Sequence, residues 1–163
     1  MLKDFIPDHI YDDIYSIDYD KLYTKGIRLL IFDIDGTILK SLNFSVTDKL
    51  VDLFVSLKIM GFTITLLTNA GNLRLDPVLA KTNITHGIAS AKKPNKSAFE
   101  KVTEQLYFSK EKTAMIGNDL YADIFGANQF GITSIFVGSL DLSIMENKIN
   151  NFILKKARKF KGK

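Results

Sequence analysis

The chain contains no cysteine, and nowhere does it contain a long hydrophobic run. Without cysteine there is no disulfide framework and no thiolate metal site, which fits a reducing compartment, so the cytoplasm is the expected location. No run approaches the roughly 20 apolar residues that span a bilayer, and residues 1–8 lack the pattern of a signal peptide. Because a chain of 163 residues can bury a hydrophobic core on its own, we expect one soluble domain.

The C-terminal end has no acidic residue from Asn147 onward, although it has seven basic ones. The remainder has fifteen basic and eighteen acidic residues, so the overall charge of +4 describes this end of the chain and gives little support to nucleic-acid binding. Segment 148–163 is expected as a solvated basic tail or as an amphipathic helix, since Ile149, Phe152 and Ile153 recur at helical spacing. Such a helix could rest on an anionic membrane surface or dock on its own domain.

Five short apolar runs alternate with helical patterns along the chain. Runs that are apolar on both faces are typical of parallel strands covered by helices on each side. The five runs span residues 27–32, 62–67, 86–89, 113–117 and 133–137. The order predicts a single doubly wound, Rossmann-like α/β domain with a central parallel sheet of about five strands. We expect this domain to span 1–147, with 1–25 as an N-terminal extension packing on it.

Three helices are predicted between these strands. Leucine and phenylalanine recur at helical spacing over 50–57, with Ser45 or Thr47 as N-cap and Gly61 as the stop. Similar patterns predict helices over 98–106, after Pro94, and over 120–127. The stretch 72–83 is predicted only weakly, because Pro77 would interrupt a helix there.

Polar residues that suit phosphoryl transfer follow four of the five runs. The carboxyl ends of parallel strands are where such sheets carry their sites. Phosphoryl transfer needs a nucleophile, oxygen ligands for Mg²⁺, donors for phosphate oxygens and a fixed cation. The residues are Asp33, Asp35, Gly36 and Thr37 after the first run, Thr68 and Asn69 after the second, Lys92 and Lys93 after the third, and Asn118, Asp119 and Asp123 after the fourth. Each group alone is typical of a turn or a helix N-cap, so the evidence lies in their joint occurrence.

The order and spacing of these groups resemble the four motifs of the haloacid dehalogenase (HAD) superfamily. The matching residues are Asp33-x-Asp35-Gly36-Thr37, Thr68, Lys93-Pro94 and Gly117-Asn118-Asp119 with Asp123. Within the superfamily the chain is similar to the YqeG-type phosphatases of subfamily IIIA, through patterns such as Phe5-Ile6-Pro7-Asp8 and Ala91-Lys92-Lys93-Pro94. The resemblance implies a Mg²⁺-dependent hydrolase of phosphomonoesters.

The resemblance also implies a role for each residue. Asp33 would attack phosphorus and hold Mg²⁺, while Asp35 would protonate the leaving alcohol, then activate water, with its backbone carbonyl on the metal. Lys93, preferred over Lys92 because it directly precedes proline, would neutralise Asp33 and the transferring group. The expected phosphate-binding residues are Thr68, Asn69, Gly36 and Thr37, of which Thr37 mainly fixes the loop.

The fourth motif departs from the commonest form, which has aspartate directly after the glycine. Here that position is Asn118, and the carboxylate has moved to Asp119. An amide oxygen can still ligate Mg²⁺, directly or through water. Which of Asn118, Asp119 and Asp123 completes a metal site with Asp33 and Asp35 stays open, and Asp123 could instead brace Lys93.

The chain has no room for the cap domain that many HAD proteins insert. Only 32 residues lie between Asp35 and Thr68, and 24 between Thr68 and Lys93. An open cleft suits a phosphate that protrudes from a large or membrane-embedded molecule. Since phosphatases similar to the YqeG group include ones acting on phosphatidylglycerophosphate, this lipid is a candidate substrate, and the protein could be peripheral to the inner membrane face.

Three other classes of protein are weighed against the phosphatase. A dehalogenase needs the nucleophile but not the second acid at Asp35, nor Mg²⁺. A response-regulator receiver also gathers acids, a threonine and a Lys-Pro pair, but its phosphorylated aspartate lies on a middle strand. The main rival is a catalytically weak protein that keeps the HAD fold as a binding or regulatory module, and Asn118 favours it.

Overall fold

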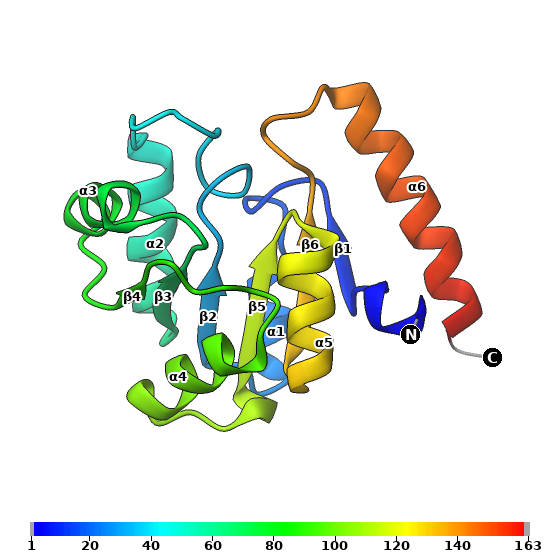
Figure 1. The fold of residues 1–163 in the computed structure, drawn as a ribbon, viewed down its shortest axis with the longest axis horizontal. Helices are drawn as coiled ribbons and strands as arrows, with labels where there is room; N and C mark the ends of the chain where they lie inside the picture. Colours follow the sequence, from blue (N-terminus) through cyan, green and yellow to red (C-terminus); the bar gives the residue numbers. More distant parts are fainter. Residues whose placement is uncertain (1, 162–163) are drawn as a thin grey trace.

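The computed structural model describes residues 2–161, with side chains described as far as Lys159, and its centre is a six-stranded parallel sheet (Figure 1). The strand order is β1-β6-β5-β2-β3-β4. The strands are β1 (His9–Tyr11), β2 (Leu29–Phe32), β3 (Thr63–Leu67), β4 (Gly87–Ile88), β5 (Thr113–Gly117) and β6 (Thr133–Val137). The helices are η1 (Leu2–Phe5), α1 (Tyr19–Thr24), α2 (Asp48–Ile59), α3 (Asn72–Thr82), α4 (Lys96–Leu106), η2 (Lys110–Lys112), η3 (Leu120–Phe125), α5 (Gly126–Phe130) and α6 (Ile144–Lys161).

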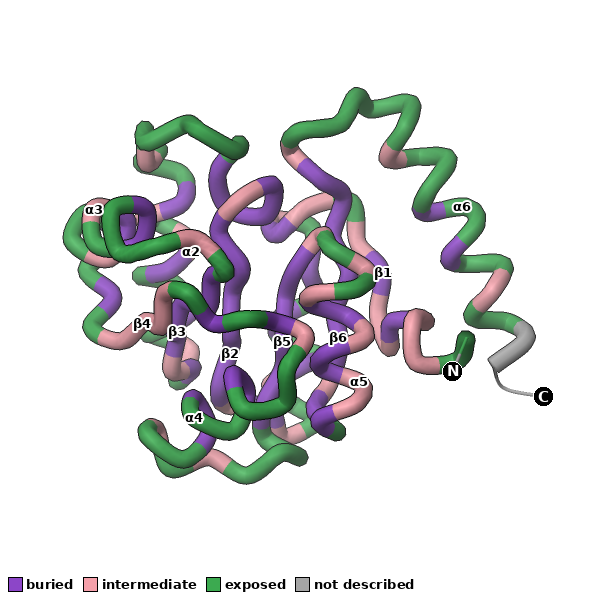
Figure 2. The backbone as a smooth tube through the Cα atoms, viewed as in Figure 1, coloured by how far each residue is buried: buried purple, intermediate pink, exposed green. Residues whose placement is uncertain are grey.

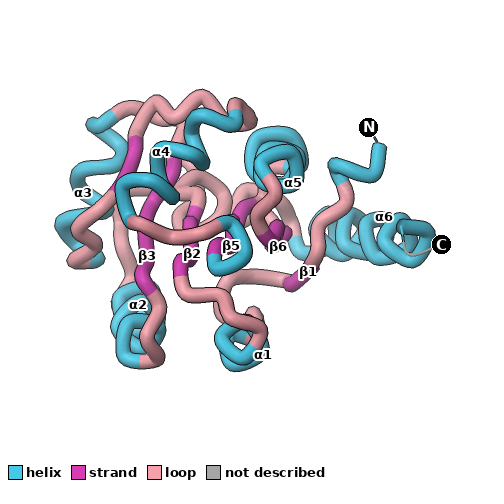
Figure 3. Tube along the Cα trace, turned by 90° about the horizontal axis from the view of Figure 1, so that it is seen from below, coloured by secondary structure: helices cyan, strands magenta, loops and turns pink. Residues whose placement is uncertain are grey.

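Helices cover both faces of the sheet, as Figure 3 shows in a view along its layers. Successive residues of a strand point to opposite faces, so Leu30 and Phe32 join the core under α1, α2 and α3. Leu29 and Ile31 join the core under α4 and α5 instead. Figure 2 shows the buried chain concentrated along these central strands. The expected single Rossmann-like α/β domain is therefore confirmed.

All five apolar runs form strands, and a sixth strand, β1, joins them at one edge of the sheet. β1 pairs in parallel with β6, in the register that places Ile10 beside Phe136. Only Ile10 of its three residues is buried. An edge strand this short carries no apolar run, which is why the sequence pattern did not reveal it.

Of two helices on one side of the sheet, α2 agrees with the prediction and α3 does not. Helix α2 begins as predicted, because the Thr47 side chain accepts a hydrogen bond from the Leu50 amide at 3.2 Å. The expectation of an interrupted helix over 72–83 is wrong, because α3 runs through Pro77. Pro77 lacks the N–H that would bond the Leu73 carbonyl, but Leu73 is exposed, while Leu75 and Val78 are buried and hold the helix on the core.

Helix α6 lies along the outside of β1 and contains most of the predicted basic segment (Figure 1). It contacts the domain through Asn147, Asn151 and Leu154, while Ile149 and Phe152 are exposed. The expected boundary between 147 and 148 stays a prediction, and the helix itself starts at Ile144. The end of the predicted tail, including Lys163, lies outside the described residues. Within residues 2–161, no helix combines the length and apolarity needed to cross a membrane.

The position of β2 sets the place of the candidate site. From β2 the chain builds β3 and β4 on one side, then returns to build β5 and β6 on the other. The order of strands therefore switches at β2, where the loops after β2, β3 and β5 diverge. Such a switch point opens a crevice at the carboxyl ends of the strands.

Candidate active site

A cavity of about 290 Å³ lies at this switch point, and eight of the ten predicted site residues line it. They come from the ends of β2, β3 and β5 and from the loop after β4. The eight are Asp33, Asp35, Thr68, Asn69, Lys93, Asn118, Asp119 and Asp123. Gly36 and Thr37 are outside the lining set and lie in the loop after β2, where the Gly36 amide donates to the Leu39 carbonyl at 2.7 Å in a tight turn. The sequence-predicted residues thus gather in one place.

The centre of the cavity is an ion triad around Lys93. Its ammonium nitrogen lies 2.8 Å from Asp33 Oδ1 and 2.7 Å from Asp123 Oδ1, and also donates to the Leu67 carbonyl at 2.8 Å. Burial opposes the charged form of Lys93, but the attraction of Asp123 and Asp33 outweighs it and raises the pKa of Lys93. The neighbouring Lys92 is exposed, and of the two lysines Lys93 is the one that lines the cavity.

Two carboxyl groups share this one ammonium, so the buried triad carries a net negative charge when both are ionised. Burial and the charge of Asp33 raise the pKa of Asp123 to about 7, although Lys93 lowers it. Asp123 Oδ2 accepts a hydrogen bond from the Asp119 amide at 3.1 Å. Both oxygens of Asp123 are thus engaged, and the geometry matches the bracing of Lys93 that the sequence left open.

Gly117 is required by the same arrangement. A Cβ at this position would stand 2.1 Å from Asp123 Oδ2, far inside van der Waals contact. Any side chain there would therefore displace the Asp123 carboxylate from Lys93. Packing against Asp123 therefore requires glycine at the first position of the Gly117-Asn118-Asp119 motif.

Thr37 links the nucleophile candidate to the fourth motif. Its hydroxyl oxygen lies 3.2 Å from Asp33 Oδ2 and 2.9 Å from Asn118 Oδ1. Asp33 and Asn118 therefore present their oxygens side by side at the cavity. Asp119 is used differently, since its Oδ1 accepts from the Tyr121 and Ala122 amides at 2.8 Å each and caps η3.

Asn69 holds the Lys93 loop by a reciprocal pair of hydrogen bonds. Its Nδ2 donates to the Lys93 carbonyl at 3.1 Å, and its Oδ1 accepts from the Lys93 amide at 2.7 Å. This use of both polar atoms orients Lys93 toward Asp33. Thr68, also buried, accepts the Ala70 amide at 3.1 Å and so shapes the turn after β3.

Arg74, which the sequence interpretation missed, holds Asp35. Its Nε donates to Asp35 Oδ1 at 2.8 Å, and its other nitrogens donate to the Lys40 carbonyl at 3.0 Å and to the Asn43 carbonyl. Arg74 lies in the first turn of α3, the helix that was not expected because of Pro77. The buried positions Leu75 and Val78, three residues apart, are the signal that would have revealed it.

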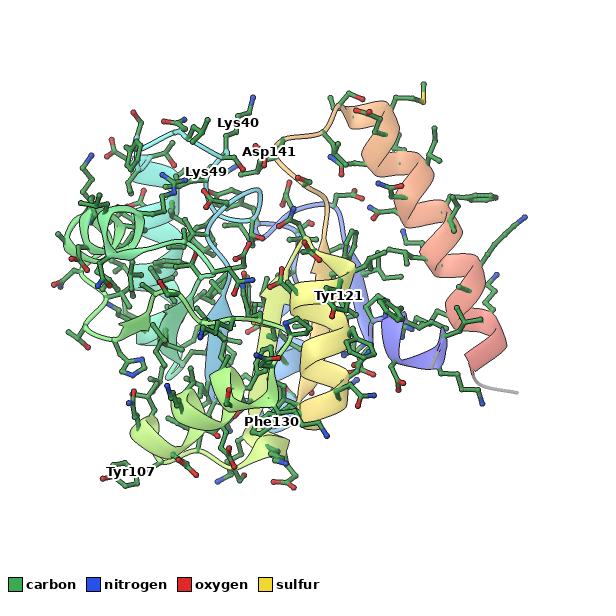
Figure 4. The ribbon with its side chains drawn as sticks, viewed as in Figure 1. Lys40, Lys49, Tyr107, Tyr121, Phe130 and Asp141 are labelled. Atoms are coloured by element: carbon green, nitrogen blue, oxygen red, sulfur yellow. The ribbon has the colours of Figure 1, made fainter. Side chains whose placement is uncertain are left out.

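A second missed contact closes the other side of the cavity. The Asp141 carboxylate, in the loop after β6, accepts from the Ser41 amide at 2.9 Å and from the Ser41 hydroxyl at 2.6 Å. Figure 4 shows Asp141 beside Lys40, where the loops after β2 and β6 meet. The loop after β2 is therefore fastened by Arg74 on one side and by Asp141 on the other.

The donor set decides what kind of metal the cavity could hold. Among the side chains described by the structure, no group of three or more His, Cys, Asp or Glu residues is arranged to hold a metal ion. The oxygens of Asp33 and Asn118, which accept hydrogen bonds from Lys93 and Thr37, belong to residues that line the cavity. Mg²⁺ prefers oxygen ligands, takes only one or two carboxylates and keeps several waters, so this donor set fits it.

Comparisons with known proteins agree with the fold. Residues 90–140 match the family model described as HAD-hydrolase-like. The chain is 28% identical over 135 residues to "Probable phosphatase YqeG" of Bacillus subtilis, covering 83% of this chain and 78% of that protein.

Two solved structures share the fold at low sequence identity. An uncharacterized protein from Listeria monocytogenes has a TM-score of 0.59 at 20% identity, covering 80% of this chain and 99% of that one. The magnesium-bound "putative HAD-hydrolase YfnB" of Bacillus subtilis has a TM-score of 0.57 at 17% identity, covering 69% and 89%.

The sheet order defines a Rossmann-like α/β domain, and polar groups gather at the ends of its strands. The chain is similar in sequence to HAD-like hydrolases over residues 90–140 and to YqeG over most of its length. The expected resemblance to YqeG-type phosphatases is confirmed at the level of sequence similarity.

Proposed function

We propose that the protein is a Mg²⁺-dependent phosphomonoester hydrolase that works through an aspartyl phosphate on Asp33. The observation that carries the proposal is the triad, in which one buried ammonium lies 2.8 Å from Asp33 at the base of an open polar cavity. The YqeG relative, named a probable phosphatase, supports the same class of reaction. A buried cation beside a carboxylate is suited to stabilise charge on a transferring phosphoryl group.

In the first half of the proposed reaction, an Asp33 carboxylate oxygen forms a bond to phosphorus as the bond from phosphorus to the substrate oxygen breaks. The Asp35 carboxylic acid gives its proton to that departing oxygen, which leaves as an alcohol. Lys93 neutralises charge on the phosphoryl oxygens. Arg74 holds one Asp35 oxygen, so the other is free to face the cavity.

In the second half, the Asp35 carboxylate takes a proton from water as that water attacks phosphorus. The bond between phosphorus and Asp33 then breaks, which releases inorganic phosphate and restores both carboxyl groups. Mg²⁺, when bound, would supply Lewis-acid stabilisation of the phosphoryl oxygens. Its proposed ligands are Asp33, the Asp35 backbone carbonyl and Asn118, with Asp119 in reach through water and Asp123 as the brace of Lys93.

The proposed substrate is large or membrane-associated, with phosphatidylglycerophosphate as the candidate. Within residues 2–161, no cap domain covers the cavity. Helix α6 turns Ile149, Phe152 and Ile153 toward solvent beside lysines such as Lys155 and Lys156. An amphipathic basic helix of this kind would lie at an anionic membrane surface. Hydrolysis of this lipid in liposomes tests the assignment, and its failure while a soluble ester is cleaved well would refute it.

Hydrolysis of p-nitrophenyl phosphate tests the reaction class. We expect turnover that needs Mg²⁺, stops with EDTA and is abolished by Asp33→Asn. The exposed Asp52 on α2 offers a matched control, since Asp52→Asn makes the same chemical change away from the cavity and should leave turnover intact. Activity that survives EDTA or Asp33→Asn would overturn the proposal.

A further inference from the structure

A second cavity, of about 490 Å³, opens beside the catalytic one. The two cavities share Asp35, Ser41 and Ala70, so they meet at the carboxyl group proposed to give the proton. One wall of the second cavity comes from the loop after β2, through Leu42 and Phe44, and the other comes from the start of α3, through Leu73. The second cavity therefore continues the first on the side of Asp35.

Three large apolar side chains line this second cavity while exposed to solvent. Leu42 is 90% exposed, Leu73 is 91% exposed and Phe44 is 49% exposed. Exposed apolar residues are common singly, but a group of them on two facing elements next to a polar site marks a binding surface. The catalytic cavity beside them is lined mainly by charged and amide side chains.

The exposure of Leu42 is built into the loop. The residues on either side of it are fastened, since Arg74 bonds the Lys40 and Asn43 carbonyls and Ser41 bonds Asp141. Leu42 itself has a φ of 61°, a left-handed conformation that a residue with a side chain adopts at a cost. The chain thus holds a leucine in water, in a strained conformation, at the edge of the site.

We propose that this second cavity binds the leaving group of the substrate and that it takes an apolar one, an alkyl or aryl group joined to the phosphate. The proposal rests on the proposed phosphatase function, because Asp35 gives its proton to the leaving oxygen and the leaving group must therefore lie on the Asp35 side. Leu42, Phe44 and Leu73 would cover its apolar surface. The preferred substrates are then phosphomonoesters of apolar alcohols rather than sugar phosphates, and phosphatidylglycerophosphate, whose phosphate is joined to a polar glycerol, would reach this cavity only with its more distant acyl chains.

The test measures kcat/KM for methyl, butyl, hexyl and octyl phosphate, each as a monomer in solution without lipid. Complete burial of one methylene is worth about fourfold in binding, so an open cleft should give a rise of roughly twofold per methylene. We expect this rise in the parent protein and a much flatter series in Leu42→Ser and in Leu73→Ser. The kcat/KM of each protein for methyl phosphate is the reference from which its own dependence on chain length is measured.

Ile59 provides the matched control, because it is 82% exposed at the far end of α2 and lines neither cavity. Ile59→Ser should keep the full dependence on chain length. Leu42 and Leu73 lie on separate elements, so if one of the two variants fails to fold, the other still tests the proposal. Retention of the parent slope by both would overturn the proposal.

The remaining outcomes separate this proposal from the one on which it rests. If methyl phosphate is hydrolysed but longer chains gain nothing, the apolar subsite is wrong and the phosphatase stands. If chain length matters only when the ester is in vesicles, the three side chains contact a bilayer, which also overturns the subsite. If no phosphomonoester is hydrolysed, the phosphatase proposal has failed, and this one falls with it.

Discussion

Replacing Lys93 by methionine would remove the ammonium that lies between Asp33 and Asp123. Two buried carboxylates would then face each other with no counter-charge, at positions now 2.8 and 2.7 Å from the same nitrogen. Removing one partner of a buried ion pair costs about 3–5 kcal/mol of unfolding free energy, because the charge left behind has lost its solvation. We expect Lys93→Met to lower the free energy of unfolding by an amount in that range.

Replacing Asp33 by asparagine should have a much smaller effect. The change leaves one ammonium and one carboxylate, Lys93 and Asp123, and the new amide oxygen can still accept from Lys93. The loss is then at most one hydrogen bond to a charged group, roughly 1.5–3 kcal/mol, and removal of the excess buried charge offsets it. Asp33, although it is the proposed nucleophile, should therefore contribute less to the free energy of unfolding than Lys93.

Urea denaturation of the three proteins, at one pH and with EDTA present, measures the difference. EDTA matters because a bound metal would stabilise only the variants that still bind it. We expect the parent and Asp33→Asn to unfold at similar urea concentrations, and Lys93→Met at a clearly lower one with an unchanged slope. Equal destabilisation by the two substitutions would refute the reasoning that Lys93 balances both carboxylates.

The other predictions concern the residues that hold Asp35 and α6. Asp35→Asn should reduce kcat at least about 100-fold while the protein stays folded by circular dichroism, as expected for loss of a general acid and base; near-normal turnover would contradict its role. Arg74→Gln should lower kcat with partial rescue by Arg74→Lys, and equal activity in both variants would argue against positioning of Asp35 by Arg74. Asn151→Leu should raise the free energy of unfolding by about 1 kcal/mol, because it removes a buried Oδ1 with no hydrogen-bond partner and leaves only the exposed Asp12 to be solvated by water. A loss of stability on urea denaturation would show that the bond to Asp12 outweighs that cost.

The central strands were predictable because they are apolar on both faces. β5 and β6 have the bounds that the apolar runs indicated. The edge strand β1 was not predictable in this way, since a single buried residue produces no pattern. Helix α3 was discounted because local propensity penalises Pro77, whereas burial of Leu75 and Val78 in the core overrides that penalty.

The site was predictable where its residues follow strands directly. Asp33, Thr68 and Asn118 come just after β2, β3 and β5, so the sheet brings them together. The contacts of Arg74 and Asp141 depend on how two loops pack, and neither residue stands in a motif. The different contacts of the two aspartates in the fourth motif could not be predicted from the sequence. In the structure, Asp119 caps η3 while Asp123 braces Lys93.

The central claim is that Asp33 becomes phosphorylated, and chemical trapping tests it most directly. The protein is mixed with p-nitrophenyl phosphate and Mg²⁺, quenched in acid during turnover and treated with borohydride, which reduces an acyl phosphate to an alcohol. Peptide mass spectrometry should then find homoserine at position 33 and unmodified aspartate at 35. Turnover without any modification at position 33, under conditions that trap a known acyl phosphate in parallel, would contradict the account.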